Sequence, residues 1–492
     1  MWDIEYSKIR RGLIWAGTND GKLWYTKDGG ANWIDVTRNF RDFPPWGTFT
    51  QIWPSTFDAG TVYASVAYHL MDDRKPYIFK STDFGTTWTK ITGDLPSGHP
   101  LDYVLSFAGN PNKPGMLFAG TARAFYFSLD DGTTWTRFRD GLPPAPVSWI
   151  TVEPRFHDVV VSTYGRGLFI LPDITLLEQT GSIAPHVTEP LLLVPSSIFR
   201  QARSVFSQPG RPHFMFFLPT APASPLDIEI TDVAGNTIRK QRVVAHQGWN
   251  GADWDLRYDP PTLVALKTTP PENPYIWDEP RFQGRDTRTI THWGITPQTG
   301  IPMASPGRYQ VRMNTDGNSF TQPFDVLKDP GVTTSVDDLT ASTATQVRIR
   351  NDITTTSMMV NQMEIWRKQI EDQLKSKPLK NEAIKALSEL NKRILDVELK
   401  LVSRSEMLSD DKYFPEAYKV YMNLIWLSGG VGMGASDEAG SVDYRPTDTQ
   451  MKVLEVIEKD LGAAAAAFDD LISTTLPAFN KTMRGKVAKI GN

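Results

Sequence analysis

The spacing of hydrophobic residues divides the chain into three parts. In residues 1–171 and 205–330, short runs of apolar and β-branched residues are separated by Gly, Pro, Asn and Asp. Such runs predict β-strands, and alternation with polar residues predicts that one face of each is buried. From residue 336 onward, apolar positions instead recur every three or four residues, which predicts helices. The pattern therefore indicates a multidomain protein that is mainly β and then α.

Four short β-prone runs recur at similar intervals in the first part. The steps from Ala16 to Ala64, Ala119 and Val161 are 48, 55 and 42 residues. Further short runs flank each of them and predict three sheets of four strands and one of three, at 2–9, 13–18, 22–26, 33–37, 49–54, 61–67, 77–81, 88–91, 102–108, 116–121, 124–128, 135–138, 147–152, 158–163 and 167–171. Such a period is typical of β-propeller blades. Residues 1–171 therefore predict a partial propeller of about three blades plus an incomplete one.

A turn motif follows three of these runs, at 26–33, 81–88 and 128–135, with the pattern Ser/Thr-x-Asp-x-Gly-x-x-Trp. A short Asp accepts hydrogen bonds from the turn that it begins, Gly allows positive φ, and Trp buries a large surface. These roles predict a structural function for Asp28, Gly30, Trp33, Asp83, Gly85, Trp88, Asp130, Gly132 and Trp135. Catalytic carboxylates are the alternative, but the repetition of one turn in successive blades favours folding.

The motif resembles the Asp-box (BNR) repeat of sialidases, xyloglucan-type glycosidases and sortilin-like (Vps10) receptors. Segments 72–77 and 162–170 are similar to a group of bacterial proteins that are labelled glycosyl hydrolase or sortilin-like. The resemblance covers nearly the whole chain and implies the C-terminal portion of such a protein. It also implies a location outside the cytoplasm and an immunoglobulin-like module after the propeller.

The remainder of the chain predicts a linker at 172–204, a β-sandwich at 205–330 and helices at 336–492. Period-two alternation at 226–230 and several turn signals support the sandwich, which resembles an immunoglobulin-like domain. A Pro- and Thr-rich insertion at 262–304 lacks a clear period and predicts a long loop.

Four helical stretches are predicted in the last part, at 337–376, 379–405, 413–428 and 446–484. Short connections favour an antiparallel helical bundle that packs on itself, and a coiled-coil partner surface is the alternative. Pro477 predicts a kink late in the last helix. The glycine-rich segment 429–434 follows a helix rather than a strand, so it predicts an interhelix loop and not a phosphate cradle.

Composition narrows the classes of function. The 492 residues include 52 Lys and Arg and 56 Asp and Glu, so the sequence lacks the excess of positive charge that is typical of nucleic-acid-binding proteins. The absence of Cys excludes disulfides, thiolate catalysis and Cys-ligated metals. The seven His residues are scattered, and we expect neither a metal site nor a cofactor.

The start of the chain shows no secretory signal, and no apolar run is long enough to span a membrane. Because three blades and a part leave open sheet edges, we expect a fragment of a longer secreted protein, extracellular or periplasmic. Missing N-terminal blades or a second subunit would then close the propeller.

Candidate binding residues lie in the loops that enter the innermost strand of each blade. These loops meet around one mouth of a propeller channel, and their aromatic residues can stack on a sugar or grip a peptide. The candidates are Trp46, Tyr103 and Trp149, with Arg123 and Arg166 near the blade ends. The alternatives are core packing for the aromatic residues and surface salt bridges for the arginines.

Two hypotheses of function remain open, and the catalytic residues are unknown in both. The first is a noncatalytic, sortilin-like recognition protein that binds peptide or glycan through propeller loops. The second is a glycosidase (O-glycosyl hydrolase) of the sialidase or xyloglucanase type, with its catalytic carboxylates mostly in missing blades. Paired carboxylates at the channel would favour the enzyme, and an aromatic, carboxylate-poor mouth would favour recognition.

Overall fold

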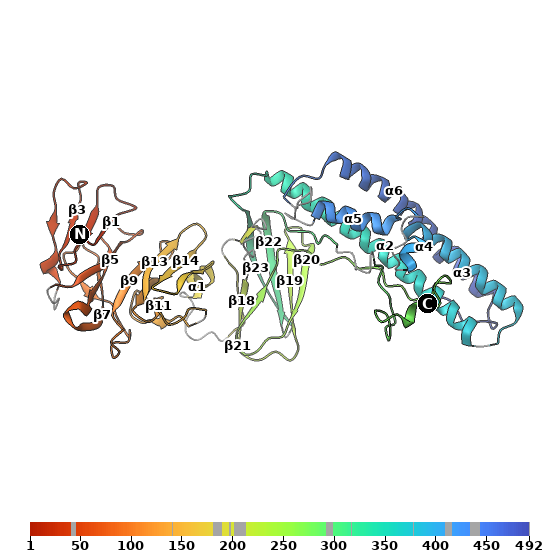
Figure 1. The fold of residues 1–492 in the computed structure, drawn as a ribbon, viewed down its shortest axis with the longest axis horizontal. Coiled ribbons are helices and arrows are strands. Elements are labelled where there is room, and N and C mark those ends of the chain that lie inside the picture. The colour runs from red at the N-terminus through yellow and green to blue at the C-terminus, as the bar shows by residue number, and fades with distance from the viewer. Residues whose placement is uncertain are drawn as a thin grey trace. The chain divides into compact units, whose positions relative to one another are not determined.

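The computed structural model describes residues 1–40, 46–139, 141–180, 189–195, 198–200, 213–291, 299–315, 317–376, 378–408, 416–432 and 443–491. The chain divides into two compact units, of which the first comprises Met1–Ser196 and Met215–Pro219 and the second the rest. The fold is mainly β, with several sheets, and it continues into helices, as predicted (Figure 1).

Four small antiparallel sheets form most of the first unit, and each keeps its strands in chain order. The first three have four strands and the fourth has three. Their strands are β1 (Asp3–Tyr6), β2 (Ile14–Gly17), β3 (Leu23–Thr26), β4 (Ile34–Asp35), β5 (Thr48–Pro54), β6 (Val62–Tyr68), β7 (Asp73–Ser81), β8 (Thr89–Lys90), β9 (Val104–Gly109), β10 (Leu117–Thr121), β11 (Phe125–Ser128), β12 (Thr136–Arg137), β13 (Val147–Glu153), β14 (Asp158–Thr163) and β15 (Gly167–Leu171). Every strand predicted from the repeat is present, although some bounds differ: β1 is shorter than the predicted 2–9 and β7 begins before the predicted 77–81.

The first strands of successive sheets lie side by side, so that β1 contacts β5, β5 contacts β9, and β9 contacts β13. We call these four the inner strands. At each junction a polar side chain of one inner strand bonds the backbone of the next: Asp3 Oδ2 accepts from Ile52 N (2.6 Å), Gln51 Oε1 accepts from Phe107 N (2.8 Å), and Ser106 Oγ donates to the Val147 carbonyl (2.8 Å).

Apolar cores fill the spaces between consecutive sheets. Trp15, which is fully buried, packs against Tyr25 at 4.8 Å and edge-on against Trp88 at 6.4 Å between ring centroids. Similar clusters lie between the second and third sheets and between the third and fourth. Burial of these aromatic side chains, each about 150–250 Å², provides the main stabilisation of this unit.

Two further sheets lie between residues 191 and 328. A three-stranded sheet has the order β16 (Leu191–Leu193), β18 (His213–Leu218), β21 (Gly248–Asp253), and a five-stranded sheet has the order β17 (Ile198–Arg200), β23 (Asn318–Lys328), β22 (Gly307–Thr315), β19 (Leu226–Asp232), β20 (Thr237–Val243). Leu226, Ile228 and Ile230 are buried, which confirms the predicted alternation in β19.

Helices make up the last part of the chain, namely α2 (Val336–Ser376), α3 (Asn381–Leu401), α4 (Arg404–Leu408), α5 (Val420–Gly432), α6 (Asp448–Asp470) and α7 (Leu476–Thr482), and a short α1 (Thr175–Thr180) belongs to the first unit. Helix α2 contacts α3, α5 and α6, and the four share one apolar core. A π-helical turn at Leu471–Thr475 precedes Pro477, where we predicted a kink.

The predicted interhelix loop at 429–434 is wrong for residues 429–432, which form the last turn of α5; residues 433 and 434 lie outside the described residues. Gly300 of the insertion allows a close approach to α5, because a Cβ on Gly300 would lie 2.4 Å from the Ser428 carbonyl oxygen. The Gly300 N–H also donates to Ser428 Oγ at 3.1 Å. This tertiary contact outweighs the weak helix propensity of glycine.

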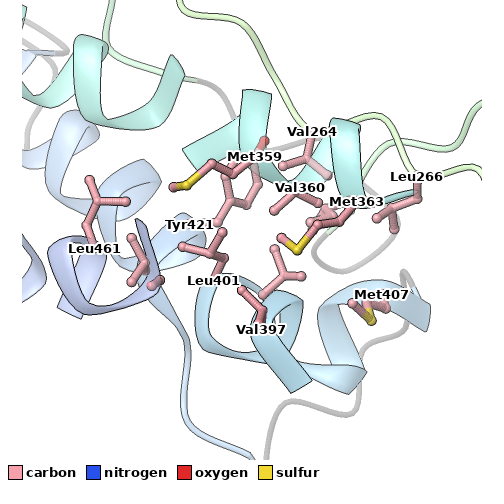
Figure 2. Close-up of a cluster of buried hydrophobic side chains, with 14 of the residues drawn as sticks. Val264, Leu266, Met359, Val360, Met363, Val397, Leu401, Met407, Tyr421 and Leu461 are labelled. Atoms are coloured by element: carbon pink, nitrogen blue, oxygen red, sulfur yellow. The ribbon is translucent and has the colours of Figure 1, made fainter. Parts of the chain in front are cut away.

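The described residues of the insertion, 262–291 and 299–304, form a long loop that packs along α2, here called the strap. Figure 2 shows Val264 and Leu266 of the strap beside Met359, Val360 and Met363 of α2 in the shared core. Polar contacts accompany the apolar ones, since Ala265 N donates to Asn361 Oδ1 at 2.7 Å and Thr268 N donates to Glu364 Oε2 at 2.7 Å. The side chains of α2 thus satisfy backbone groups that a sheet would otherwise pair.

Candidate functional site

A hollow of about 480 Å³ lies along the four inner strands of the first unit. We call it the inner-strand hollow. The described residues that line it are Glu5, Tyr6, Lys8, Gln51, Ile52, Trp53, Pro54, Thr56, Ala108, Gly109, Pro111, Asn112, Trp149, Ile150, Thr151, Val152 and Pro154. Its size is within the range of small-molecule and peptide side-chain sites. Successive inner strands supply its wall, so the sheet packing described above fixes its shape.

Aromatic side chains are the most prominent feature of the hollow. Tyr6 is 58% exposed and Trp149 is 47% exposed, although each has a large apolar surface. Trp53 adds a third ring, which packs against Tyr63 at 5.8 Å between centroids. The Lys8 ammonium lies 3.7 Å from the centroid of the Tyr6 ring, which is within cation–π range. Exposed rings on a rigid wall can stack on a flat or apolar face of a ligand.

Trp149 occupies a position that has another role in the other three sheets. In strand register, Asp3 lies opposite Gly17, Gln51 opposite Ser65, Ser106 opposite Gly120, and Trp149 opposite Ser162. These four positions are therefore equivalent in the repeat. The first three carry the polar side chains that bond the next inner strand. In the fourth sheet this position is occupied by Trp149, which lines the hollow.

Carboxylates are sparse in the hollow, since Glu5 is the single acidic residue among the described residues that line it. Burial raises the pKa of Glu5, the nearby charge of Asp3 raises it further, and Lys8 opposes both. Asp3 is buried and bound to the Ile52 N–H, and burial raises its pKa as well. Within the described residues, no group of three or more His, Asp or Glu could hold a metal ion.

The other predicted binding residues are not brought together with Trp149 in this hollow. Tyr103 stacks on His69, with 4.4 Å between ring centroids, and Arg123 Nε donates to Asp102 Oδ1 at 2.7 Å. Trp46 is 62% exposed in the loop before β5, and Arg166 is exposed in the turn before β15. The adjoining loop residues 43–45 lie outside the described residues.

Sequence reasoning missed Tyr6, Lys8 and Trp53 as residues of the hollow. They lie within or directly after inner strands and not in the loops that enter them. The signal was available, because every second residue of an inner strand shares one face. Listing every aromatic residue of the four inner strands would have found Tyr6 and Trp53, whereas Lys8 follows β1 and gave no signal.

The three repeat turns share one hydrogen-bonding pattern. In each turn, the Asp carboxylate accepts hydrogen bonds from the Ser or Thr hydroxyl two residues before it and from the backbone N–H four residues after it. The Gly two residues after the Asp has positive φ. Trp88 and Trp135 each donate their indole N–H to the carbonyl of that Gly, at 3.1 and 3.2 Å. Trp33 differs, since it is 38% exposed.

Replacing Asp83 by Ala is expected to destabilise the first unit by about 1–2 kcal/mol. The side chain accepts from Thr87 N at 2.8 Å and from Thr87 Oγ1 at 2.7 Å. Burial opposes ionisation of this carboxyl, but the hydrogen bonds from Thr87 and Ser81 hold its pKa below the ordinary value. Chemical denaturation followed by tryptophan fluorescence measures the effect. Asp72→Asn is the control, because that side chain is 95% exposed and Asn tolerates the positive φ (59°) at this position; equal losses in both variants would contradict the structural role.

Comparisons with known proteins do not assign the chain to a family, since no family model and no curated protein matches it. Solved structures give partial likenesses of low score. YCF48 from Cyanidioschyzon merolae is 15% identical over 35% of this chain and 55% of its own, with a TM-score of 0.24. A structure of YCF48 bound to D1 peptide is 13% identical over 65% and 79%, with a TM-score of 0.26. A GH74 xyloglucanase from Xanthomonas campestris is 14% identical over 65% and 44%, with a TM-score of 0.29.

None of the helices in the described part of the chain is both long and apolar enough to cross a bilayer.

Proposed function

We propose that the first unit is part of an Asp-box β-propeller that recognises a glycan or a peptide in the inner-strand hollow, without catalysis. The observation that carries this proposal is the pairing of exposed Tyr6 and Trp149 rings with a single acidic residue on the same wall. Sugar rings and Pro or aromatic side chains present flat apolar faces that stack on such rings. A glycosidase needs two carboxyl groups about 5–10 Å apart across the scissile bond, which this wall does not supply from its described residues.

The polar groups around the rings would fix the ligand's orientation. Glu5, Lys8, Thr56 and Asn112 line the hollow and offer both hydrogen-bond donors and acceptors. A few polar groups set among apolar surface are characteristic of small-ligand sites. Glycan hydroxyls or peptide amides would meet these groups while the ring faces stack.

We propose that the remaining parts support the propeller. The five- and three-stranded sheets would form an immunoglobulin-like sandwich, and α2, α3, α5 and α6 an antiparallel helical bundle. The sharing of one core by these helices supports internal packing over a coiled-coil partner surface. As in sortilin-like and BNR-repeat proteins, the whole would act outside the cytoplasm.

Trp149→Ala is expected to weaken ligand binding by about 5- to 150-fold, if stacking on this ring contributes the roughly 1–3 kcal/mol of a base–aromatic contact. Soluble oligosaccharides and peptides selected on glycan and peptide arrays are the probes, and isothermal titration calorimetry measures their Kd. Trp46→Ala is the matched control, since Trp46 is at least as exposed but lies outside the hollow.

An assay for hydrolysis of chromogenic glycosides tests the alternative function, a glycosidase. Turnover that is lost in Glu5→Gln but retained in Trp46→Ala would contradict noncatalytic recognition and would favour the glycosidase. Equal Kd values for Trp149→Ala and the unaltered protein would instead remove the hollow as the binding site.

A further inference from the structure

A small cavity of about 20 Å³ lies in the second unit, where the strap meets α2, α3 and α4. This volume accommodates about one water molecule or one monatomic ion. Three arginines line it, namely Arg288 of the strap, Arg367 of α2 and Arg404 of α4, and so do Glu272 and Glu364. The other described lining residues are Leu, Met, Pro or Thr. We call this space the arginine cavity.

Arg288 is a buried cation without a carboxylate partner. The two carboxyl groups that line the cavity pair with the other arginines: Glu364 Oε1 lies 2.8 Å from Arg367 Nη1, and Glu272 Oε1 lies 3.0 Å from Arg404 Nη1. Within the part of the chain that the structure describes, no ion pair includes Arg288, although this residue is only 2% exposed.

The hydrogen bonds of Arg288 leave one N–H unused. Nη1 donates to the Met407 carbonyl at 2.9 Å, and Nη2 donates to the Thr268 carbonyl at 3.1 Å. Nε is shielded from solvent and has no hydrogen-bond partner among the described residues. Neutral carbonyl groups solvate a cation but do not neutralise it. Both a buried donor and a buried charge therefore lack a partner at this cavity.

Other groups near Arg288 offset its charge only in part. The rings of Trp277 and Phe282 lie 5.4 and 5.8 Å from its guanidinium carbon, near the outer limit of cation–π range. The negative charge of Glu279 favours the cation, but Arg281 opposes this effect, and the two are paired at 2.8 Å. Burial lowers the pKa of Arg288 to about 10, so the side chain is still a cation at neutral pH.

The buried charges beside the cavity do not balance at neutral pH. Arg288 and Arg367 contribute two buried guanidinium groups. Glu364 and Glu398 are the buried carboxyl groups in contact with Arg367, and both accept from its Nη1 at 2.8 Å. Burial raises the pKa of Glu398 to about 8, so this carboxyl is mainly protonated at neutral pH. At most one carboxylate then compensates two buried cations, which is unfavourable without a further anion.

We infer that the arginine cavity binds one monatomic anion, of which chloride is the abundant example. The anion would accept the unused Arg288 N–H and supply the missing negative charge. A water molecule would accept the same hydrogen bond but would leave the charge unbalanced, and oxyanions such as phosphate are larger than the cavity. The anion would join the strap to α2 and α4. It would therefore stabilise the second unit, whichever ligand the first unit binds.

Chloride is expected to stabilise the second unit in a saturable manner. A ligand that binds only the folded state lowers the unfolding constant by the factor 1 + [L]/Kd, which is about 11-fold at ten times Kd. Urea denaturation of the full chain, followed by the helical circular dichroism signal, measures this constant while sodium chloride replaces sodium gluconate at fixed ionic strength. The unaltered chain should gain stability up to a plateau.

Arg288→Gln removes both the charge and the unused N–H, so it should abolish this gain, and any change that it still shows measures general salt effects. Arg348→Gln is the matched control and should keep the full gain, because Arg348 pairs with Glu458 and does not line the cavity. Equal gains in the unaltered chain and in Arg288→Gln would contradict the site. If Arg288→Gln does not fold, Arg404→Gln replaces it. Arg404 lies in a half-exposed ion pair, and its loss should reduce the gain.

Bromide locates the anion directly, because it replaces chloride and scatters X-rays anomalously. Crystals of the unaltered chain soaked in sodium bromide should show an anomalous peak in the arginine cavity, at hydrogen-bonding distance from Arg288 Nε. Water in the cavity that does not exchange with bromide, or bromide on the exposed surface only, would overturn the inference.

Discussion

Glu364→Gln is expected to destabilise the helices of the second unit by about 3 kcal/mol or more. Glu364 is 1% exposed and accepts from the backbone of Lys267, from Thr268 N at 2.7 Å and from Thr268 Oγ1 at 2.7 Å. It also accepts from Arg367 Nη1 at 2.8 Å. A glutamine has one accepting oxygen, so its amide N–H group would meet donors on one side. The variant would therefore loosen the strap from α2 and leave a buried guanidinium with less charge compensation.

Arg367 contacts two buried carboxyl groups, and the charge balance around it determines whether both are ionised. Arg367 Nη1 also donates to Glu398 Oε2 at 2.8 Å, and Glu398 is fully buried. One guanidinium compensates one carboxylate, so two ionised carboxylates here would leave a buried negative charge. Burial, assisted by the charge of Glu364, raises the pKa of Glu398 to about 8. At neutral pH we therefore expect Glu398 to be protonated.

Glu398→Gln is the matched control for Glu364→Gln. Because a protonated carboxyl and an amide have similar shape and hydrogen-bonding capacity, we expect this variant to lose no stability at neutral pH, where folded Glu398 must hold a proton that the unfolded chain releases. The measurement is urea denaturation followed by the helical circular dichroism signal, which arises almost entirely from residues 336–482. A loss in Glu398→Gln as large as that in Glu364→Gln would contradict the protonated state of Glu398.

The strands and helices could be predicted from the sequence because their signals are local. The repeat places Ala16, Ala64, Ala119 and Val161 at the same point of four sheets, and the observed register agrees. The strap could not be predicted, since Thr268 and Glu364 are 96 residues apart and neither has an unusual local pattern. The helical state of residues 429–432 could not be predicted for a similar reason, because α5 packs against Gly300, which lies 128 residues before Ser428.

The candidate site was predicted in part. Trp149 was proposed from its loop-proximal position, and the structure places it on the wall of the hollow. Tyr103 and Arg123 have the same kind of position but have partners in His69 and Asp102. Side-chain type and strand position do not reveal whether a partner is present, because partners come from other segments. Only the packed structure separates an aromatic residue that is available for a ligand from one that is already stacked.

The stability of the second unit is expected to fall as pH rises from about 4.5 to about 8, owing to Glu398. In this window the folded state holds a proton on Glu398 that the unfolded state has released. The unfolded chain therefore binds fewer protons, and the unfolding free energy decreases by about 1.4 kcal/mol per pH unit for this group. Below the window both states are protonated, and above it both are ionised, so the contribution is constant at either side.

Glu398→Gln isolates this contribution. Burial also raises the pKa of Glu406 to about 7, so Glu406 contributes a slope of the same sign. In Glu398→Gln we expect the unfolding free energy to depend less steeply on pH, by the contribution of one proton, but not to become independent of pH. Near pH 8 this variant should be more stable than the unaltered protein. Urea denaturation at about pH 5, 6.5 and 8 gives the slope directly. A slope that is unchanged by the substitution would show that Glu398 is ionised in the folded state throughout this range. The buried cluster would then need a second compensating cation, and Arg288, which is 2% exposed and interacts electrostatically with Glu364, is a candidate.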